Sequence, residues 1–287
     1  MKSILVATDL TERSDRAMDR AALLAKQTGA MLRVVHVVDD EVSSVIAKAV
    51  EKNAKTELQR QVNDGPFFKG LKCDVTVAFG EAWRKIVEIA NRLEVDLVVM
   101  GAHRNRGIRE LFGGTTLHRI AKSCTRPMVV AVDRALDGYK KVIVGADFSE
   151  CARHAADLAA SIATNRPLTL VHAYHIPYKG LTTRTDAHGD IALHEKERLE
   201  AEIAPQMEAF IEALQNPIGQ TDVKLVEGGP VVVLSTLARS LDADLVCVGT
   251  HAKPWLQEAI LGSTAYELLS FPPCDLLIAP LIKSPAT

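Results

Sequence analysis

The stretch VDLVVMG-AHRNRGIRELF-GGTTLHRIAKSC-TRPMVVAV, residues 95–132, decides the fold of this chain, because it recurs at residues 243–279 as ADLVCVG-THAKPWLQEAIL-GSTAYELLS-FPPCDLLIA. Each copy contains an apolar run ending in glycine, a polar loop, a small-residue turn, a helical segment and a second apolar run. An offset of 148 positions separates three pairs: Gly101 and Gly249, Gly114 and Gly262, and Thr115 and Ser263. Two turns and two apolar runs held at one offset indicate a tandem repeat.

Length and composition agree with two ordinary globular domains. The chain has 287 residues, with 47% hydrophobic and 24% charged residues, as soluble proteins do. Each half, of roughly 140 residues, can bury a full core without disulfides or metal. A net charge of −2 and an aromatic content of 5% favour neither nucleic acid nor an anionic membrane as a partner.

Cysteine usage and apolar run lengths indicate the compartment. The five cysteines are odd in number and form no CxxC pair, which predicts a reducing interior. The apolar run at residues 4–7 is too short for a signal peptide, and no run is long enough to cross a bilayer. We therefore expect a cytoplasmic protein with no membrane partner.

Strands and helices alternate along both halves. In the first half, apolar runs predict strands at residues 3–8, 32–38, 73–78, 95–100 and 128–132. Helical spacing predicts helices at residues 14–28, 41–62 and 115–124, with another opening at Gly80-Glu81-Ala82. This alternation implies right-handed crossovers and a doubly wound, mainly parallel sheet.

The second half repeats this order with an insertion. Asp9 and Asp147 are 138 positions apart, whereas the later motifs are 148 apart, so about ten extra residues lie between His175 and Gln220. That region contains a long Glu- and Ala-rich helical segment. The predicted domains are residues 1–133 and 140–283, joined by a polar linker at residues 134–139.

Residues at the carboxyl ends of the strands are the candidates for chemistry, because open parallel sheets bind ligands there, where the strand order reverses. They are Asp9, Val37 and Gly101 in the first half and Asp147, Ala173 and Gly249 in the second. The turns 113–115 and 262–264 lead into helix N-termini, whose N–H groups and positive dipole end suit phosphate. The two aspartates could accept from ribose hydroxyls or hold a phosphate-bound metal. A strand-ending glycine is also ordinary turn geometry, and Ser or Thr there is also an ordinary N-cap.

These motifs resemble those of the universal stress protein family in its tandem two-domain form, over essentially the whole chain. The matching pieces are VATDLTERS and VGADFSECA, VVHVVD and LVHAYH, FGEAW and EGGPV, and MGAHR…GGTT and VGTHA…GSTA. The resemblance implies two Rossmann-like α/β domains of the HUP, adenine nucleotide alpha hydrolase-like type, each a five-stranded sheet with helices on both faces. In the family such domains pair through their last strands, here residues 128–132 and 276–279. That pairing would make the chain an intramolecular pseudo-dimer, which could dimerise again.

Nucleotide-binding members of that family carry glycine, two residues, glycine, nine residues, glycine, then Ser or Thr. The first, third and fourth positions of this motif fall on Gly101, Gly114 and Thr115, and on Gly249, Gly262 and Ser263. The second glycine is replaced by Arg104 and Ala252, and a Cβ there could block a phosphate. Arg104 could instead bind phosphate through its guanidinium or be a solvated loop charge. Ala252 is the milder change, which favours the second half as the nucleotide site.

The resemblance places adenine near Val37 or Ala173, with His103 and His251 donating to phosphate or capping the loop and Thr264 beside Ser263. The implied ligand is ATP or a related nucleotide, with or without Mg²⁺, in a stress-response binding protein whose hydrolysis, if any, is slow. The lost second glycines leave an alternative: a site for another phosphorylated or acyl metabolite, or an interaction scaffold. Zinc is disfavoured because the histidine spacing at His172, His175, His188 and His194 matches no standard pattern.

Overall fold

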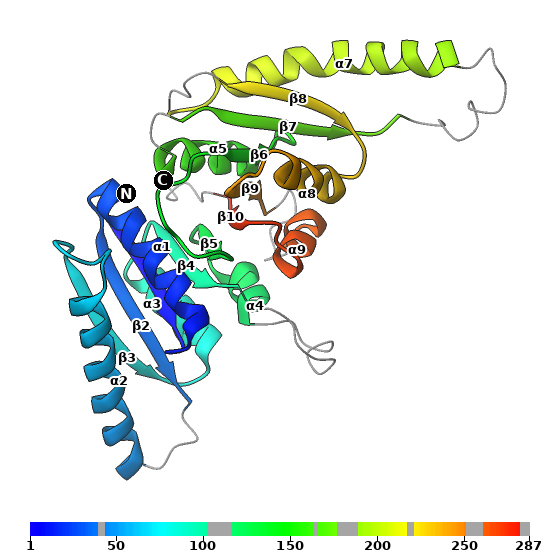
Figure 1. Cartoon of the computed structure of the whole chain (residues 1–287). Helices are drawn as coiled ribbons and strands as arrows, with labels where there is room; N and C mark the ends of the chain where they lie inside the picture. Colours follow the sequence, from blue (N-terminus) through cyan, green and yellow to red (C-terminus); the bar gives the residue numbers. More distant parts are fainter. Residues whose placement is uncertain are drawn as a thin grey trace, which may run out of the picture.

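The computed structural model describes residues 1–39, 44–102, 116–163, 166–176, 189–216, 221–250 and 261–281. Within these ranges one continuous sheet has the order β3-β2-β1-β4-β5-β10-β9-β6-β7-β8 (Figure 1). Its strands are β1 (Ser3–Thr8), β2 (Met31–Val38), β3 (Cys73–Phe79), β4 (Leu97–Gly101), β5 (Met128–Ala131), β6 (Val142–Gly145), β7 (Leu168–Tyr174), β8 (Asp222–Glu227), β9 (Leu245–Gly249) and β10 (Asp275–Ala279). The helices are α1 (Glu12–Thr28), α2 (Ser44–Asp64), α3 (Ala82–Arg92), α4 (Thr116–Ser123), α5 (Glu150–Ile162), α7 (Gly189–Glu212), α8 (Pro230–Ser240) and α9 (Ser263–Ser270).

The two halves join edge to edge in the middle of this sheet. Strands β5 and β10 pair antiparallel, with Val129 opposite Leu277, whereas the other paired strands are parallel. Each half therefore contributes five strands, and the predicted pairing through the last strands is confirmed within one chain. The predicted doubly wound α/β fold is confirmed as well.

Alternate residues of each strand supply two separate cores, one on each face of the sheet. Ile4 and Val6 of β1 belong to the core under α1, α2, α5 and α7, whereas Leu5 and Ala7 belong to the core under α3, α4, α8 and α9. Because both faces are covered, the strands contain continuous apolar runs. Each fully buried large aliphatic side chain stabilises the fold by about 1.5–3 kcal/mol.

The duplication extends to unusual backbone conformations. Leu10 (φ 62°) corresponds to Phe148 (φ 63°), and Glu94 (φ 48°) corresponds to Asp242 (φ 53°). Left-handed conformations are uncommon for residues other than glycine. The same conformations recur at equivalent turns, so the two halves share one turn geometry.

The halves differ most around α7, where the sequence predicts extra residues. This helix lies along β7 and β8 at one end of the molecule (Figure 1), and Met207 and Phe210 bury its inner face. The Tyr174 hydroxyl donates to Glu200 at 2.7 Å, which ties β7 to the helix. Among the described residues no helix is both long enough and apolar enough to span a membrane.

A buried polar cluster fastens the first half to the second. The Arg20 guanidinium, on α1, donates from Nε to Asp275 of β10 at 2.8 Å, and its Cζ lies 4.0 Å from the Tyr139 ring centroid. The Tyr139 hydroxyl and the Val132 amide also donate to Asp275, each at 2.8 Å. Burial raises the pKa of Tyr139 well above its ordinary value, so this hydroxyl stays protonated and keeps donating.

Equivalent residues also meet where the halves touch on the opposite face. His118 of α4 and Tyr266 of α9 occupy the same position in the repeat, and their ring centroids are 4.5 Å apart. His118 Nε2 also hydrogen-bonds the Ser270 hydroxyl at 3.0 Å. A titratable ring therefore lies in the junction between the halves.

We expect acid to weaken this junction through His118. Burial lowers the pKa of His118 below its ordinary value of 6.5, so the unfolded chain takes up the proton at a higher pH than the folded chain. The stability linked to this group is complete above that value and is lost as the pH falls below it. When the pH is lowered from neutral to mildly acidic, the free energy of unfolding measured in urea should fall less for His118→Gln than for the wild-type protein. Equal losses would contradict this assignment.

Candidate functional site

The strand order reverses beside the first strand of each half. Strand β1 lies between β2 and β4, and β6 lies between β7 and β9. Chain segments leave such neighbouring strands toward opposite faces, which opens a crevice at their carboxyl ends. The sheet therefore offers two equivalent positions for a small ligand.

The first-half position is a cleft of about 190 Å³. Three of the predicted residues, Asp9, Val37 and Gly101, line it together although they lie at the carboxyl ends of different strands. Its other lining residues are Ala7, Thr8, Ser14, Val35, Ala82, Ile86, Met100, Ala102, Thr116 and Leu117. One wall is aliphatic, while the hydroxyls of Thr8, Ser14 and Thr116 and the Asp9 carboxyl supply polar groups.

Asp9 is held as a carboxylate at the end of β1. Its Oδ1 accepts from the Thr11 amide at 3.0 Å and from the Thr11 hydroxyl at 2.6 Å. Burial raises the pKa of Asp9, but these hydrogen bonds outweigh it and leave the pKa below the ordinary value. The Thr8 and Ser14 hydroxyls are 2.8 Å apart beside it. At neutral pH this cleft contains an anionic acceptor next to an apolar wall.

The second half positions Asp147, Ala173 and Gly249 at the ends of β6, β7 and β9. Asp147 Oδ1 accepts from the Ser149 amide at 3.0 Å, a short-range turn like the one at Asp9. Ala146 and Ala152 stand where the first half has Thr8 and Ser14. The second position therefore lacks those two hydroxyls.

The turn Gly262-Ser263-Thr264 opens α9, as predicted. Gly262 is the N-cap residue, and its own amide donates to the Thr250 carbonyl at 2.6 Å. The amides of Ser263 and Thr264 belong to the first helical turn, where N–H groups have no acceptor inside the helix. Any phosphate bound here would rely on these amides rather than on that of Gly262.

Gly249 has a structural reason to be glycine. A Cβ built on it would lie 2.6 Å from Cys151 Cβ and 2.8 Å from the Ala152 amide nitrogen, both in the first turn of α5. The helix thus packs directly against the backbone of β9. Cys151 is itself buried in this contact, as expected of a packed thiol.

We expect Gly249→Ala to destabilise the protein by about 1–3 kcal/mol, because α5 would have to move away from the sheet. Thermal or denaturant unfolding of the unliganded protein measures the loss. Gly229→Ala is the matched control, because a Cβ there meets nothing within 4 Å. If both variants unfold alike, close packing is not the reason for Gly249.

The remaining predicted residues lie outside the described part of the chain. They are His103, Arg104, Gly114 and Thr115 in the first half and His251 and Ala252 in the second. Among the described residues, no group of three or more His, Cys, Asp and Glu side chains is arranged to hold a metal ion.

Comparison with known proteins identifies the family. The profile of the universal stress protein family matches residues 1–132 and 138–280, which is most of the chain in two copies. The chain belongs to the universal stress protein family. Universal stress protein A homolog 1 of Coxiella burnetii is 30% identical over 120 residues, covering 39% of this chain and 83% of that protein.

Solved universal stress protein structures share the fold. One from Archaeoglobus fulgidus superimposes with a TM-score of 0.68 at 17% identity, covering 98% of both chains, and supports the fold alone. Another, described as a universal stress protein in complex with cAMP, is 24% identical. The match covers 51% of this chain and 100% of that chain, and its TM-score of 0.34 indicates only a weak structural likeness.

Sequence reasoning missed several polar residues of this universal stress protein. Thr8 and Ser14 line the first cleft, and the rings of His36 and His172 hydrogen-bond the carbonyls of Thr8 and Ala146 at 2.9 and 2.6 Å. The two histidines are equivalent in the repeat, each pairing a second strand with the end of a first one. Their recurrence inside two apolar strands was the available signal.

Proposed function

We propose that this universal stress protein binds ATP or a related nucleotide at the carboxyl ends of its strands. The observation that supports this best is the first-half cleft, where Asp9, Val37 and Gly101 line one hollow. The sequence alone predicts these three residues at the carboxyl ends of separate strands. A small-molecule site needs an apolar surface with a few converging polar groups, and this cleft has both.

The chemistry of the lining supports a position for each part of the proposed ligand. The aliphatic wall of Val35 and Val37 suits a base, and the Asp9 carboxylate can accept from ribose hydroxyls. Phosphates would lie toward the N-terminus of α4 or α9, where helix amides and the dipole favour anions. In this proposal the protein acts by binding its ligand, with at most slow hydrolysis.

We propose the second half as the tighter site. Ala252 is a smaller replacement for the motif's second glycine than Arg104, and Gly262-Ser263 keeps the small residues that a phosphate requires. Ala173 and Ala265 also replace the larger Val37 and Leu117 of the first cleft. The cleft in the first half supports an additional nucleotide site there, which we propose to be the weaker of the two. A role for Mg²⁺, a cytoplasmic location and further dimerisation belong to the same proposal.

A different metabolite is the second candidate. The replacement of the motif's second glycine in both halves favours another phosphorylated or acyl-bearing ligand, or a scaffold role without one. Mass spectrometry of small molecules released from freshly purified protein separates these cases. Adenine nucleotides alone would support the first proposal, and a different phosphorylated or acyl compound would support the second.

Equilibrium titration with a fluorescent ATP analogue in the presence of Mg²⁺ tests the first proposal directly. We expect saturable binding that unlabelled ATP displaces. A folded sample that shows no saturable binding would exclude a nucleotide function.

A further inference from the structure

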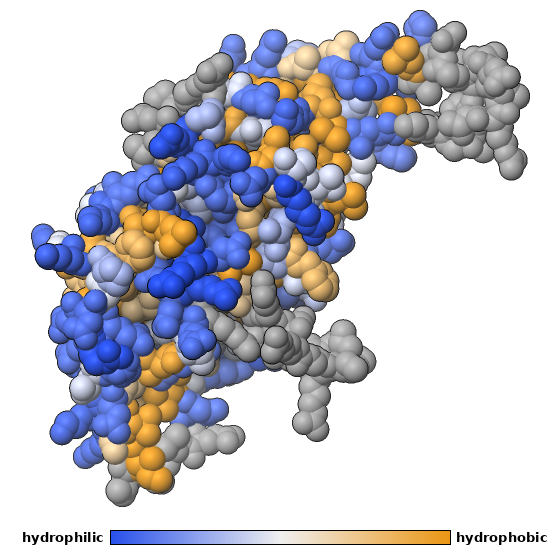
Figure 2. Space-filling model, viewed as in Figure 1, coloured by the Kyte–Doolittle hydropathy of each residue, from blue (hydrophilic) through white to orange (hydrophobic). Residues whose placement is uncertain are grey.

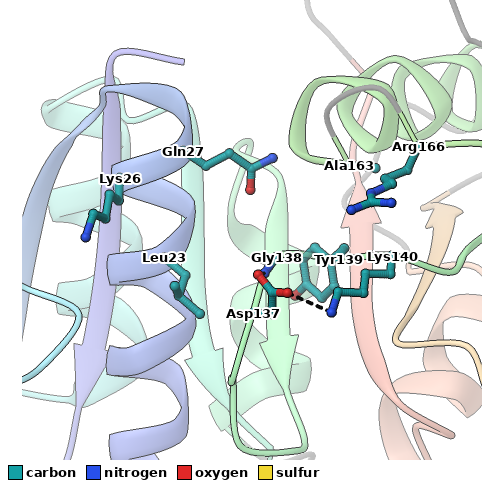
Figure 3. A pocket seen from close by; sticks show the side chains of 9 residues that line it. All are labelled: Leu23, Lys26, Gln27, Asp137, Gly138, Tyr139, Lys140, Ala163 and Arg166. Atoms are coloured by element: carbon teal, nitrogen blue, oxygen red, sulfur yellow. Dashed lines mark hydrogen bonds and ion pairs between the residues drawn. The ribbon is translucent and has the colours of Figure 1, made fainter.

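A second hollow lies between the halves, away from the first-half cleft at the carboxyl ends of the strands. Its volume is about 310 Å³. It lies near the carboxyl end of α1 and the segment leading into β6. This is the side of the sheet where the strands begin, opposite the cleft at their carboxyl ends. The lining residues are Leu23, Lys26, Gln27, Asp137, Gly138, Tyr139, Lys140, Ala163 and Arg166 (Figure 3). It thus has one wall from each half and a floor from the linker.

The lining is rich in cations. Lys26, Lys140 and Arg166 are cationic and Asp137 is the one acid among the lining residues. Figure 3 shows the Arg166 guanidinium and the Gln27 amide directed toward the same space, with the Asp137–Lys140 ion pair, 2.7 Å long, beside them. Hydrophilic and hydrophobic residues are mixed over the middle of the face of the molecule seen in Figure 2. The lining residues therefore carry a net positive charge.

The floor of the hollow is held in place from both sides. Arg20 Nη1 donates to the Asp137 carbonyl at 2.9 Å, and the Tyr139 hydroxyl is fixed by Asp275. The Lys140 amide donates to Asp244 at 2.7 Å. On the wall, Gln27 Nε2 donates to the Ile162 carbonyl at 2.7 Å, which links α1 to α5. A site organised before binding loses less entropy when a ligand arrives.

We propose that this inter-half hollow is a second binding site, which takes a small molecule carrying an oxyanion, either phosphate or carboxylate. Its volume falls in the range of small-molecule sites, roughly 300–1,000 Å³. The planar guanidinium of Arg166 can bind such a group with two hydrogen bonds, and Lys140 adds a point charge. A ligand here contacts both halves, so its binding would strengthen their association.

Isothermal titration calorimetry of the full chain tests this proposal. Pyrophosphate and succinate serve as separate probes, at low ionic strength. We expect at least one probe to bind saturably and to raise the melting temperature. Lys140→Gln/Arg166→Gln should weaken binding by about tenfold or more, since two charge contacts are removed. Arg60→Gln/Lys196→Gln is the matched control, because it removes the same charges from exposed helical ion pairs elsewhere.

Asp137→Asn should change the affinity for the oxyanion probe in the opposite direction. It releases Lys140 from its ion pair and removes the one acidic group, while the amide oxygen can still accept from the Gly138 amide. Binding should become severalfold tighter, an outcome that misfolding cannot imitate. The proposal is wrong if neither probe binds saturably, or if the control pair weakens binding as much as the Lys140/Arg166 pair. It is also wrong if Asp137→Asn leaves the affinity unchanged.

The nucleotide proposal and this one fail independently. Bulky substitutions at the carboxyl ends of the strands, such as Val37→Phe and Ala173→Phe, should leave binding of the oxyanion probe unchanged. If they abolish it instead, the probe occupies a phosphate position of the nucleotide site and the inter-half hollow is not a second site.

Discussion

Asp275→Leu is expected to lower the free energy of unfolding by about 3–5 kcal/mol, the cost of leaving a buried charge without its partner. The Arg20 side chain is 7% exposed and that of Asp275 is 1% exposed. Leucine would leave the guanidinium without its carboxylate and the Tyr139 hydroxyl and Val132 amide without their acceptor. Denaturant unfolding monitored by circular dichroism measures the loss.

Two further variants show whether the lost ion pair causes that loss. Asp74→Leu removes the acid of the partly exposed Arg33–Asp74 pair and should cost no more than about 1 kcal/mol. Arg20→Met/Asp275→Leu removes both buried charges and should recover much of the stability, because well-packed apolar groups can replace a buried ion pair. If Asp275→Leu is no worse than Asp74→Leu, the cluster does not hold the halves together.

Ala173→Phe is expected to weaken binding of the ATP analogue by about 10- to 100-fold, more than Val37→Phe at the equivalent position of the first half. A phenyl group at the strand end would fill the space assigned to the base, and a steric cost of about 1–3 kcal/mol corresponds to that loss of affinity. Fluorescence titration of both variants measures the effect. Phenylalanine is favourable in strands, so the fold should be retained.

Comparing the two variants identifies the site. A larger loss in Val37→Phe would show that the first-half cleft is the tighter site and that the lost second glycine matters less than expected. If both variants bind like the wild-type protein, nucleotide does not bind at the strand ends. Circular dichroism and the melting temperature of each variant control for misfolding.

The sequence by itself determined the repeated doubly wound fold and where its strands end. Continuous apolar runs and helical spacing are local patterns, and the offsets of 138 and 148 positions place about ten extra residues in the region that contains α7. Because all parallel strands of one half end at the same edge, Asp9, Val37 and Gly101 could be expected to meet, and they line one cleft.

Only the tertiary structure decided which distant residues became partners. Arg20 lies on the apolar stripe that contains Ala17, Ala21 and Leu24, which marks it as unusual but does not identify Asp275, 255 positions away. The contact of Gly249 with α5 and the hollow at Lys140 and Arg166 likewise arise from packing between elements. Periodicity reports which face of an element is buried. The group that faces it is set by how whole elements pack, and in this chain by the antiparallel junction of β5 and β10.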